Sequence, residues 1–200
     1  MAVLLISTLL LLISSSSNHW VCSSSYVEDA CSVTRYQDLC IRSLSSFSRT
    51  AKSSPSKWAR AGVSVTLSES KNTTQFLVRM LQDKEFSGPG TNRNRIALSD
   101  CVECFREAVD ELHRSLALLR NLLDGAADFE AQMADLTTWV GAALTDQDTC
   151  LDGFRDREQV SVKSKSKSSM KMVRRRVRRV GYIMSNALAL ITRLASAGLA

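Results

Sequence analysis

The sequence predicts an all-α fold: an up-down four-helix bundle, preceded by a short N-terminal helical hairpin and held by two disulfides. Three observations predict it. Apolar residues recur at alternating spacings of three and four along several stretches of the chain, which is the period of a buried helix face. No segment shows the sustained period-two alternation of a half-buried strand. Only two prolines occur in 200 residues, so long stretches are free to be helical.

The chain begins with an apolar run at residues 3–13, followed by serines. This run is shorter than the ~20 residues that span a bilayer, and we interpret residues 1–25 as a secretory signal peptide. The alternative is a buried or membrane-anchoring N-terminal helix. No other stretch is expected to span a membrane, because Asn186 and Arg193 interrupt the apolar C-terminal tail. Residues 26–200 then form one helical domain, long enough to bury a core.

Breaks in the sequence divide this domain into helices. Residues 28–49 are helical in pattern and form the expected hairpin. Pro55 marks the entry to the first long helix, because proline is tolerated at helix starts. The Gly-Pro-Gly segment at 88–90, Gly125 and the Ser/Lys-rich run at 161–169 mark the three connections between long helices. The four long helices are expected at residues 57–84, 94–122, 128–156 and 170–197.

The sequence contains six cysteines, and a secreted protein forms disulfides readily. Cys101 and Cys150 lie on the apolar seams of adjacent predicted helices, so a bond between them inside the bundle is sterically reasonable. Cys31 and Cys40 are nine positions apart, a separation that suits a bridge closing the short hairpin.

A zinc site is not expected at Cys101-x-x-Cys104. Zinc needs a second cysteine pair or nearby histidines, and the only histidines are His19 and His113. We interpret Cys104 as a small buried apolar residue. Pairing with Cys22 and a reactive thiol are the alternatives.

Nothing in the sequence indicates catalysis. There is no Gly-rich phosphate loop, no nucleophile elbow and no cluster of metal ligands. His113 lies on a helix flank beside the seam and is interpreted as a rim or surface residue. We therefore expect no catalytic residue, no metal and no cofactor, and a protein that acts by binding a partner.

A dense basic stretch carries nine Lys and Arg residues between Lys163 and Arg179 with no acid among them. The whole chain is +6, so the remainder carries −3. In an intracellular protein this run would suggest nucleic-acid binding or nuclear import. The signal peptide, the cysteines and the predicted glycan acceptor Asn72 argue instead for secretion, where such charge attracts polyanions. The alternative is a solvated linker and helix start. The polyanion-binding candidates are Lys171, Arg174, Arg175, Arg176, Arg178 and Arg179.

Four strings carry a family resemblance: CSVTRYQDLCIRSLSS at 31–46, ALSDCVECFREAVDELHRS at 97–115, TTWVGAALTDQDTCLDGF at 137–154 and SNALALITRL at 185–194. With these strings in this order, the chain resembles the plant invertase and pectin methylesterase inhibitor family. The resemblance implies a four-helix bundle with an N-terminal hairpin and the bridges Cys31–Cys40 and Cys101–Cys150. The chain departs from the family at Gln37, Cys104 and Gly141, where members commonly carry proline, an aromatic residue and serine.

The resemblance also indicates a branch of the family. Invertase inhibitors resemble one another in a late Pro-Lys-Phe segment, which is absent here, since the only prolines are Pro55 and Pro89. The TC-x-DGF string at 149–154 looks more like the pectin methylesterase side. The resemblance therefore implies a pectin methylesterase inhibitor secreted to the cell wall or apoplast, with cell-wall or vacuolar acid invertase as the alternative target.

The mechanism implied by the resemblance is occlusion of the enzyme's substrate cleft in a noncovalent one-to-one complex. We expect enzyme contacts from an acidic helix face, with the solvated face of an ordinary helix as the alternative. The basic stretch would hold the protein near acidic, demethylesterified pectin. The enzyme-contact candidates are Glu103, Asp110, Asp135 and Thr138.

Overall fold

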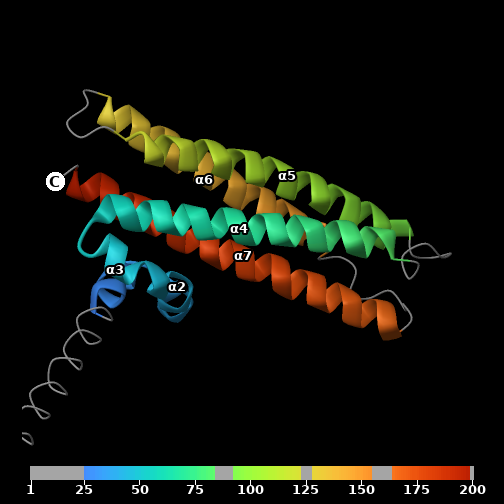
Figure 1. The fold of residues 1–200 in the computed structure, drawn as a ribbon. Helices are drawn as coiled ribbons and strands as arrows, with labels where there is room; N and C mark the ends of the chain where they lie inside the picture. Colours follow the sequence, from blue (N-terminus) through green and yellow to red (C-terminus); the bar gives the residue numbers. More distant parts are fainter. Residues whose placement is uncertain (1–24, 84–91, 123–127, 155–163, 199–200) are drawn as a thin grey trace, which may run out of the picture.

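The computed structural model describes residues 25–83, 92–122, 128–154 and 164–198. Within them, four long helices dominate and no strand occurs: α4 (Pro55–Gln82), α5 (Asn92–Arg120), α6 (Phe129–Asp152) and α7 (Ser164–Ala197). Each helix packs against the two beside it, with α4 and α7 closing the ring, and successive helices run in opposite directions (Figure 1). The predicted all-α, up-down bundle is confirmed. Residues 1–24 of the expected signal peptide, the Gly-Pro-Gly segment and Gly125 lie outside the described residues.

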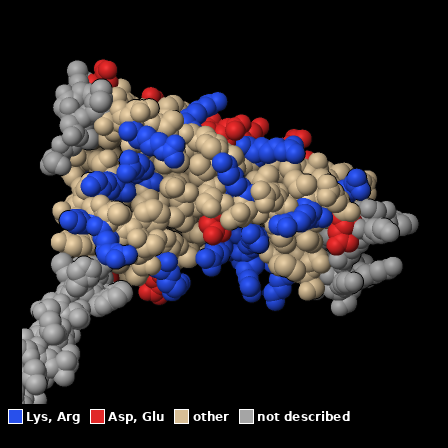
Figure 2. Space-filling view, viewed as in Figure 1, with Lys and Arg blue, Asp and Glu red and all other residues tan. Residues whose placement is uncertain are grey.

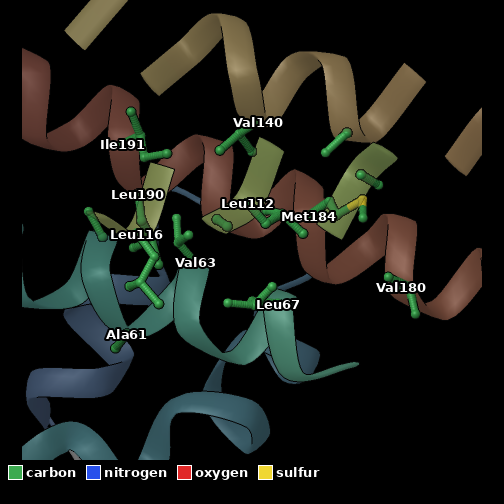
Figure 3. Close-up of a cluster of buried hydrophobic side chains, with 14 of the residues drawn as sticks. Ala61, Val63, Leu67, Leu112, Leu116, Val140, Val180, Met184, Leu190 and Ile191 are labelled. Carbon is green, nitrogen blue, oxygen red and sulfur yellow. The ribbon is translucent and has the colours of Figure 1, made fainter. Parts of the chain in front are cut away.

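The hydrophobic core runs along the axis of the bundle, where each long helix turns one apolar face inward. Val63, Leu112, Val140, Met184 and Ile191 come from four different helices and are fully buried (Figure 3). Burying one such side chain stabilises the fold by about 1.5–3 kcal/mol relative to leaving it exposed. The apolar seams predicted by the spacing of three and four are therefore the main source of stability.

The starts of α4 and α7 show how local chemistry sets helix ends. Ser54 caps α4, because its Oγ accepts a hydrogen bond from the Lys57 backbone N at 3.4 Å and Pro55 occupies the first helical position. α7 begins at Ser164, inside the run at 161–169 that the composition predicts as a linker. The linker prediction is wrong for residues 164–169. This segment has no Gly or Pro to end a helix, and lysine is a good helix former.

The N-terminal segment forms a helical hairpin beside α4 and α7 (Figure 1). Residues 25–31 are helical, and α2 (Gln37–Leu44), the 3-10 turn Ser45–Phe47 and α3 (Ser48–Ala51) follow. A disulfide between Cys31 and Cys40 joins the two arms, with their Cα atoms 5.8 Å apart.

Side chains of α7 fix this hairpin to the bundle. Asn186, only 4% exposed, binds both backbone groups of Tyr36: its Oδ1 accepts from the Tyr36 N at 3.2 Å and its Nδ2 donates to the Tyr36 O at 3.0 Å. The Tyr36 ring stacks on Tyr182 with centroids 4.1 Å apart. Arg193 donates to the carbonyl and the carboxylate of Asp29, the latter at 2.7 Å. The hairpin is thus a fixed part of the bundle surface.

The second disulfide, Cys101–Cys150, joins α5 to α6 in the interior, where the two residues are 0% and 3% exposed. Cys104 keeps a free thiol and packs, half-buried, at the edge of the core. Cys104 therefore packs against the core as expected, but the predicted full burial is wrong because the side chain stays half-exposed. Its alternative partner, Cys22, lies outside the described residues.

By length and composition alone, Ser168–Ala197 of α7 could cross a membrane. Half of its apolar window is buried inside the bundle, and Val177, Met184 and Leu194 are at most 1% exposed there. The apolar face of this helix is therefore already covered by its neighbours in the core.

Candidate functional site

The four predicted enzyme-contact residues all lie on the bundle surface. Glu103 and Asp110 are exposed on α5, two turns apart on one helix face, and Asp135 and Thr138 are exposed on the neighbouring α6. Because a heptad spacing returns to the same side of a helix, Glu103 and Asp110 can meet one partner surface together. The structure brings the candidates onto two adjacent helices and leaves each accessible to a partner.

Carboxylates also line the seam between α5 and α6, around Asp146. Burial, and then the charges of Glu107 and Glu111, raise the pKa of Asp146. Burial and the neighbouring Asp146 and Glu107 carboxylates likewise raise the pKa of the Cys104 thiol. A thiol in such surroundings stays protonated and is a poor nucleophile, which argues against the reactive-thiol alternative for Cys104.

Asp146→Asn is expected to raise the melting temperature at about pH 7 and to leave it unchanged near pH 3. The raised pKa means that the folded state binds this proton more tightly than the unfolded chain. Wild-type stability therefore falls as the pH rises from the ordinary value of 3.8 through the raised one, whereas asparagine mimics the protonated form throughout. Thermal melts across this range measure the difference. Asp148→Asn removes an exposed carboxylate from the same helix as the control, and an equal shift in both variants would contradict the assignment.

Charge is strongly segregated between helices. α6 carries five Asp and Glu residues and no Lys or Arg, whereas α7 carries nine Lys and Arg residues and no acid. On the face shown in Figure 2, blue side chains gather over α4, α7 and the hairpin, and red and blue ones alternate along the edge where α5 lies. The opposite charges therefore belong to α6 and α7, and these two helices can attract different partners.

The structure divides the predicted basic patch into two groups. Lys171, Arg175, Arg178 and Arg179 are exposed on the outer face of α7. Arg176 turns the other way: its guanidinium lies 4.9 Å from the Phe76 ring centroid on α4, and its Nε donates to Thr73 Oγ1 at 3.4 Å. Arg174 is half-buried. The outer-face residues are thus the ones placed to meet a polyanion.

A groove between the hairpin and α7 brings in two arginines that sequence reasoning missed. It is lined by Arg35 and Arg42 of the hairpin and by Arg175, Arg178 and Arg179 of α7, with Asp38 as its one acid. Tyr36 and Tyr182 complete the walls with their stacked rings. Arg35 lies in the turn before α2 and Arg42 lies on α2 itself, so no helical spacing in the sequence placed the two on one face. Nothing in the sequence shows that this face opposes α7, so the groove could not be predicted.

A second basic groove lies at the α3 end of α4. Its charged lining consists of Arg49, Lys52, Lys57, Arg60 and Arg120, all exposed. Apolar side chains such as Leu116 also line it. This groove has no stacked aromatic pair, and its cations come from both Lys and Arg.

The remaining predicted site residues are at the surface. Asn72 is exposed on α4, and Thr74 Oγ1 donates to the Ser70 carbonyl at 3.0 Å, so glycosylation of Asn72 stays a prediction. His113 is exposed on α5, in keeping with its interpretation as a surface residue. Within the described ranges, no group of three or more His, Cys, Asp or Glu residues could hold a metal ion.

Comparisons with known proteins give matches over most of this chain. The sequence pattern of the family described as plant invertase/pectin methylesterase inhibitor matches residues 25–190. Pectinesterase inhibitor 6 of Arabidopsis thaliana is 46% identical over 176 residues, which are 88% of this chain and 78% of that protein. Pectinesterase inhibitor 3 of the same plant is 34% identical, over 84% of this chain and 78% of its own length.

A solved structure shows the same fold. The crystal structure of mutant form A of a pectin methylesterase inhibitor from Arabidopsis superposes with a TM-score of 0.58. The superposed residues are 81% of this chain and 92% of that chain, and the two sequences are 20% identical. Because the family pattern spans most of the chain and relatives reach 46% identity, this chain belongs to the plant invertase/pectin methylesterase inhibitor family.

Proposed function

We propose that this protein is an inhibitor of pectin methylesterase, which it binds in a noncovalent one-to-one complex. The observation that carries the proposal is the 46% identity to a pectinesterase inhibitor over 88% of the chain. The two curated relatives described above are both named as pectinesterase inhibitors, which favours this target over acid invertase. The protein itself performs no catalytic step in this proposal.

The bundle suits inhibition by occlusion of a substrate cleft. Two disulfides cross-link it, and Asn186 and Arg193 fix the hairpin to α7. A rigid surface loses little conformational entropy when it binds, so more of the contact energy appears as affinity. The exposed polar face of α5 and α6 would cover the cleft and exclude the polymer.

The triple variant Glu103→Ala, Asp110→Ala, Asp135→Ala is expected to inhibit pectin methylesterase at least about tenfold more weakly, because charged contacts of this kind guide and hold a complex. Inhibition assays with purified enzyme measure the change. The control variant Glu130→Ala, Asp148→Ala removes two exposed carboxylates from the other side of α6 and should keep wild-type potency. Unchanged potency in the first variant would refute the contact assignment.

The target itself is tested by assaying the wild-type protein against pectin methylesterase and acid invertase side by side. Inhibition of pectin methylesterase alone is the expected result. Inhibition of invertase alone would move the protein to the other branch of its family. Inhibition of neither would leave a binding module without inhibitory activity.

We further propose that the protein is secreted to the cell wall and that its basic face attracts acidic pectin and not nucleic acid. The outer face of α7, with Lys171, Arg175, Arg178 and Arg179, supplies the charge. Attraction of this kind is screened by salt, so retention on a polygalacturonate column should weaken as ionic strength rises. Salt-independent retention would contradict this attraction.

Secretion is checked by sequencing the mature N-terminus, which should begin near residue 26.

A further inference from the structure

The groove between the hairpin and α7 has the walls of a binding site. Arg178 and Arg179 lie three and four positions after Arg175, so the three share one face of α7, and Arg175 and Arg179 lie about 6 Å apart along the axis. Arg35 and Arg42 face them from the hairpin. With Asp38 as the only acid of the lining, the groove carries a net charge of +4.

These five arginines are available to a ligand. All five are exposed, and within the described part of the chain none of them forms an ion pair. Arg35 lies 5.8 Å from the centroid of the Tyr36 ring, a contact that leaves its N–H groups open. A guanidinium presents a planar fork that binds carboxylates in a bidentate manner, so two opposed walls that carry arginines fit a chain with repeated carboxylates.

The hairpin wall is held in place before any ligand arrives. The Cys31–Cys40 bridge closes the hairpin, Asn186 binds both backbone groups of Tyr36, and Tyr36 stacks on Tyr182 across the groove walls. Like charges are thereby kept close together by packing that does not depend on them. A bound polyanion would relieve the repulsion between these arginines. Because the walls are already in place, no free energy would be spent on forming the groove.

We infer that this groove binds a carboxylated polysaccharide, a run of uronate sugars of the kind that a pectinesterase produces. The choice of polymer rests on the proposed function: hydrolysis of a methyl ester on pectin leaves a carboxylate, so the product of the inhibited enzyme is the polyanion that matches the groove. The inhibitor would then concentrate where the enzyme has already acted. The stacked, half-buried tyrosine pair adds an apolar part to the groove lining beside the charges, which suits sugar rings better than a purely ionic patch would.

Because the groove has two walls, one wall can be changed while the other stays intact. A fluorescently labelled oligogalacturonate of fixed length is titrated with the wild-type protein and with Arg35→Gln/Arg42→Gln, which changes the hairpin wall only. We expect this variant to bind about tenfold more weakly, although it leaves every cation of α7 in place. Asp38→Asn removes the one opposing charge and should bind more tightly than the wild type.

The second basic groove supplies the matched control. Arg49→Gln/Arg60→Gln removes the same charge from exposed positions at the α3 end of α4, and should change the affinity less than about twofold. Equal losses in the two double variants would show attraction by net charge alone and overturn the site. Wild-type binding by Arg35→Gln/Arg42→Gln would overturn it as well. So would tighter binding to a single-stranded DNA of equal charge than to the oligogalacturonate.

The same proteins, assayed for inhibition of pectin methylesterase, separate this inference from the proposed function. Full inhibition by Arg35→Gln/Arg42→Gln with weakened sugar binding supports both. Sugar binding without any inhibition by the wild type would overturn the proposed function and leave the groove standing. Parallel loss of inhibition and sugar binding in the hairpin variant would assign these arginines to the enzyme interface, and the separate polysaccharide site would be wrong.

Discussion

Replacing Cys101 and Cys150 together by alanine is expected to lower the free energy of unfolding by about 4 kcal/mol. The bridge joins cysteines with a sequence separation of 49 and so removes many conformations from the unfolded chain. Both cysteines are buried between α5 and α6, where smaller alanine side chains add a packing loss. Because small domains are stable by only about 5–15 kcal/mol, the variant should unfold at much lower denaturant concentration than the wild type.

Urea unfolding of the two proteins measures this difference, and Cys31→Ala/Cys40→Ala is the comparison. Its loop has a sequence separation of 9, and loop-closure entropy predicts a loss of somewhat under about 3 kcal/mol. The long-loop variant should therefore lose more than the short-loop one. The reverse order would contradict the view that the α5–α6 bridge is the main covalent support of the bundle.

Gly181→Ala is expected to destabilise the fold by about 1–3 kcal/mol, the usual range for overpacking a core. Gln147 on α6 is 2% exposed, and its amide lies directly on Gly181 of α7, so a Cβ at position 181 would overlap Gln147 Oε1. Helix propensity alone predicts the opposite sign, a gain of about 1 kcal/mol. The sign of the change in the free energy of unfolding therefore shows whether overpacking or helix propensity dominates.

Thermal or urea unfolding gives that sign, and Gly141→Ala is the control. Gly141 also lies inside a helix, but a Cβ there meets nothing within 4 Å, so this variant should be stabilised by about 1 kcal/mol. Adding Gln147→Ala to Gly181→Ala should recover part of the loss, because the overlapping amide is gone. A stabilised Gly181→Ala would show that Gln147 has room to move aside.

Most of the fold could be predicted because each element has a local cause. The spacing of three and four located the buried faces of α4 to α7. The full burial of one residue from each helix shows this: Val63, Phe105, Val140 and Val177. Ser54 and Pro55 supplied a helix start that is readable from the sequence. The start of α7 was placed too late because polar Ser and Lys residues were taken as a linker, whereas no residue there opposes a helix.

The candidate site could be predicted only in part, because long-range packing decides which side chains meet. Charge density indicated the basic face, yet it could not tell that Arg176 packs on Phe76 of α4 while Arg175 and Arg179 line a groove. The hairpin wall depends on Asn186 binding Tyr36 across a separation of 150 residues. A single sequence contains no signal for that contact.

The inhibitor mechanism is tested most directly by the kinetics of pectin methylesterase with a soluble pectin substrate at several inhibitor concentrations. Occlusion of the cleft predicts a rising apparent KM with unchanged kcat, and a titration endpoint at one inhibitor per enzyme. A falling kcat with constant KM would mean that substrate and inhibitor bind together. That result, or an endpoint far from one to one, would contradict a bundle that blocks the cleft.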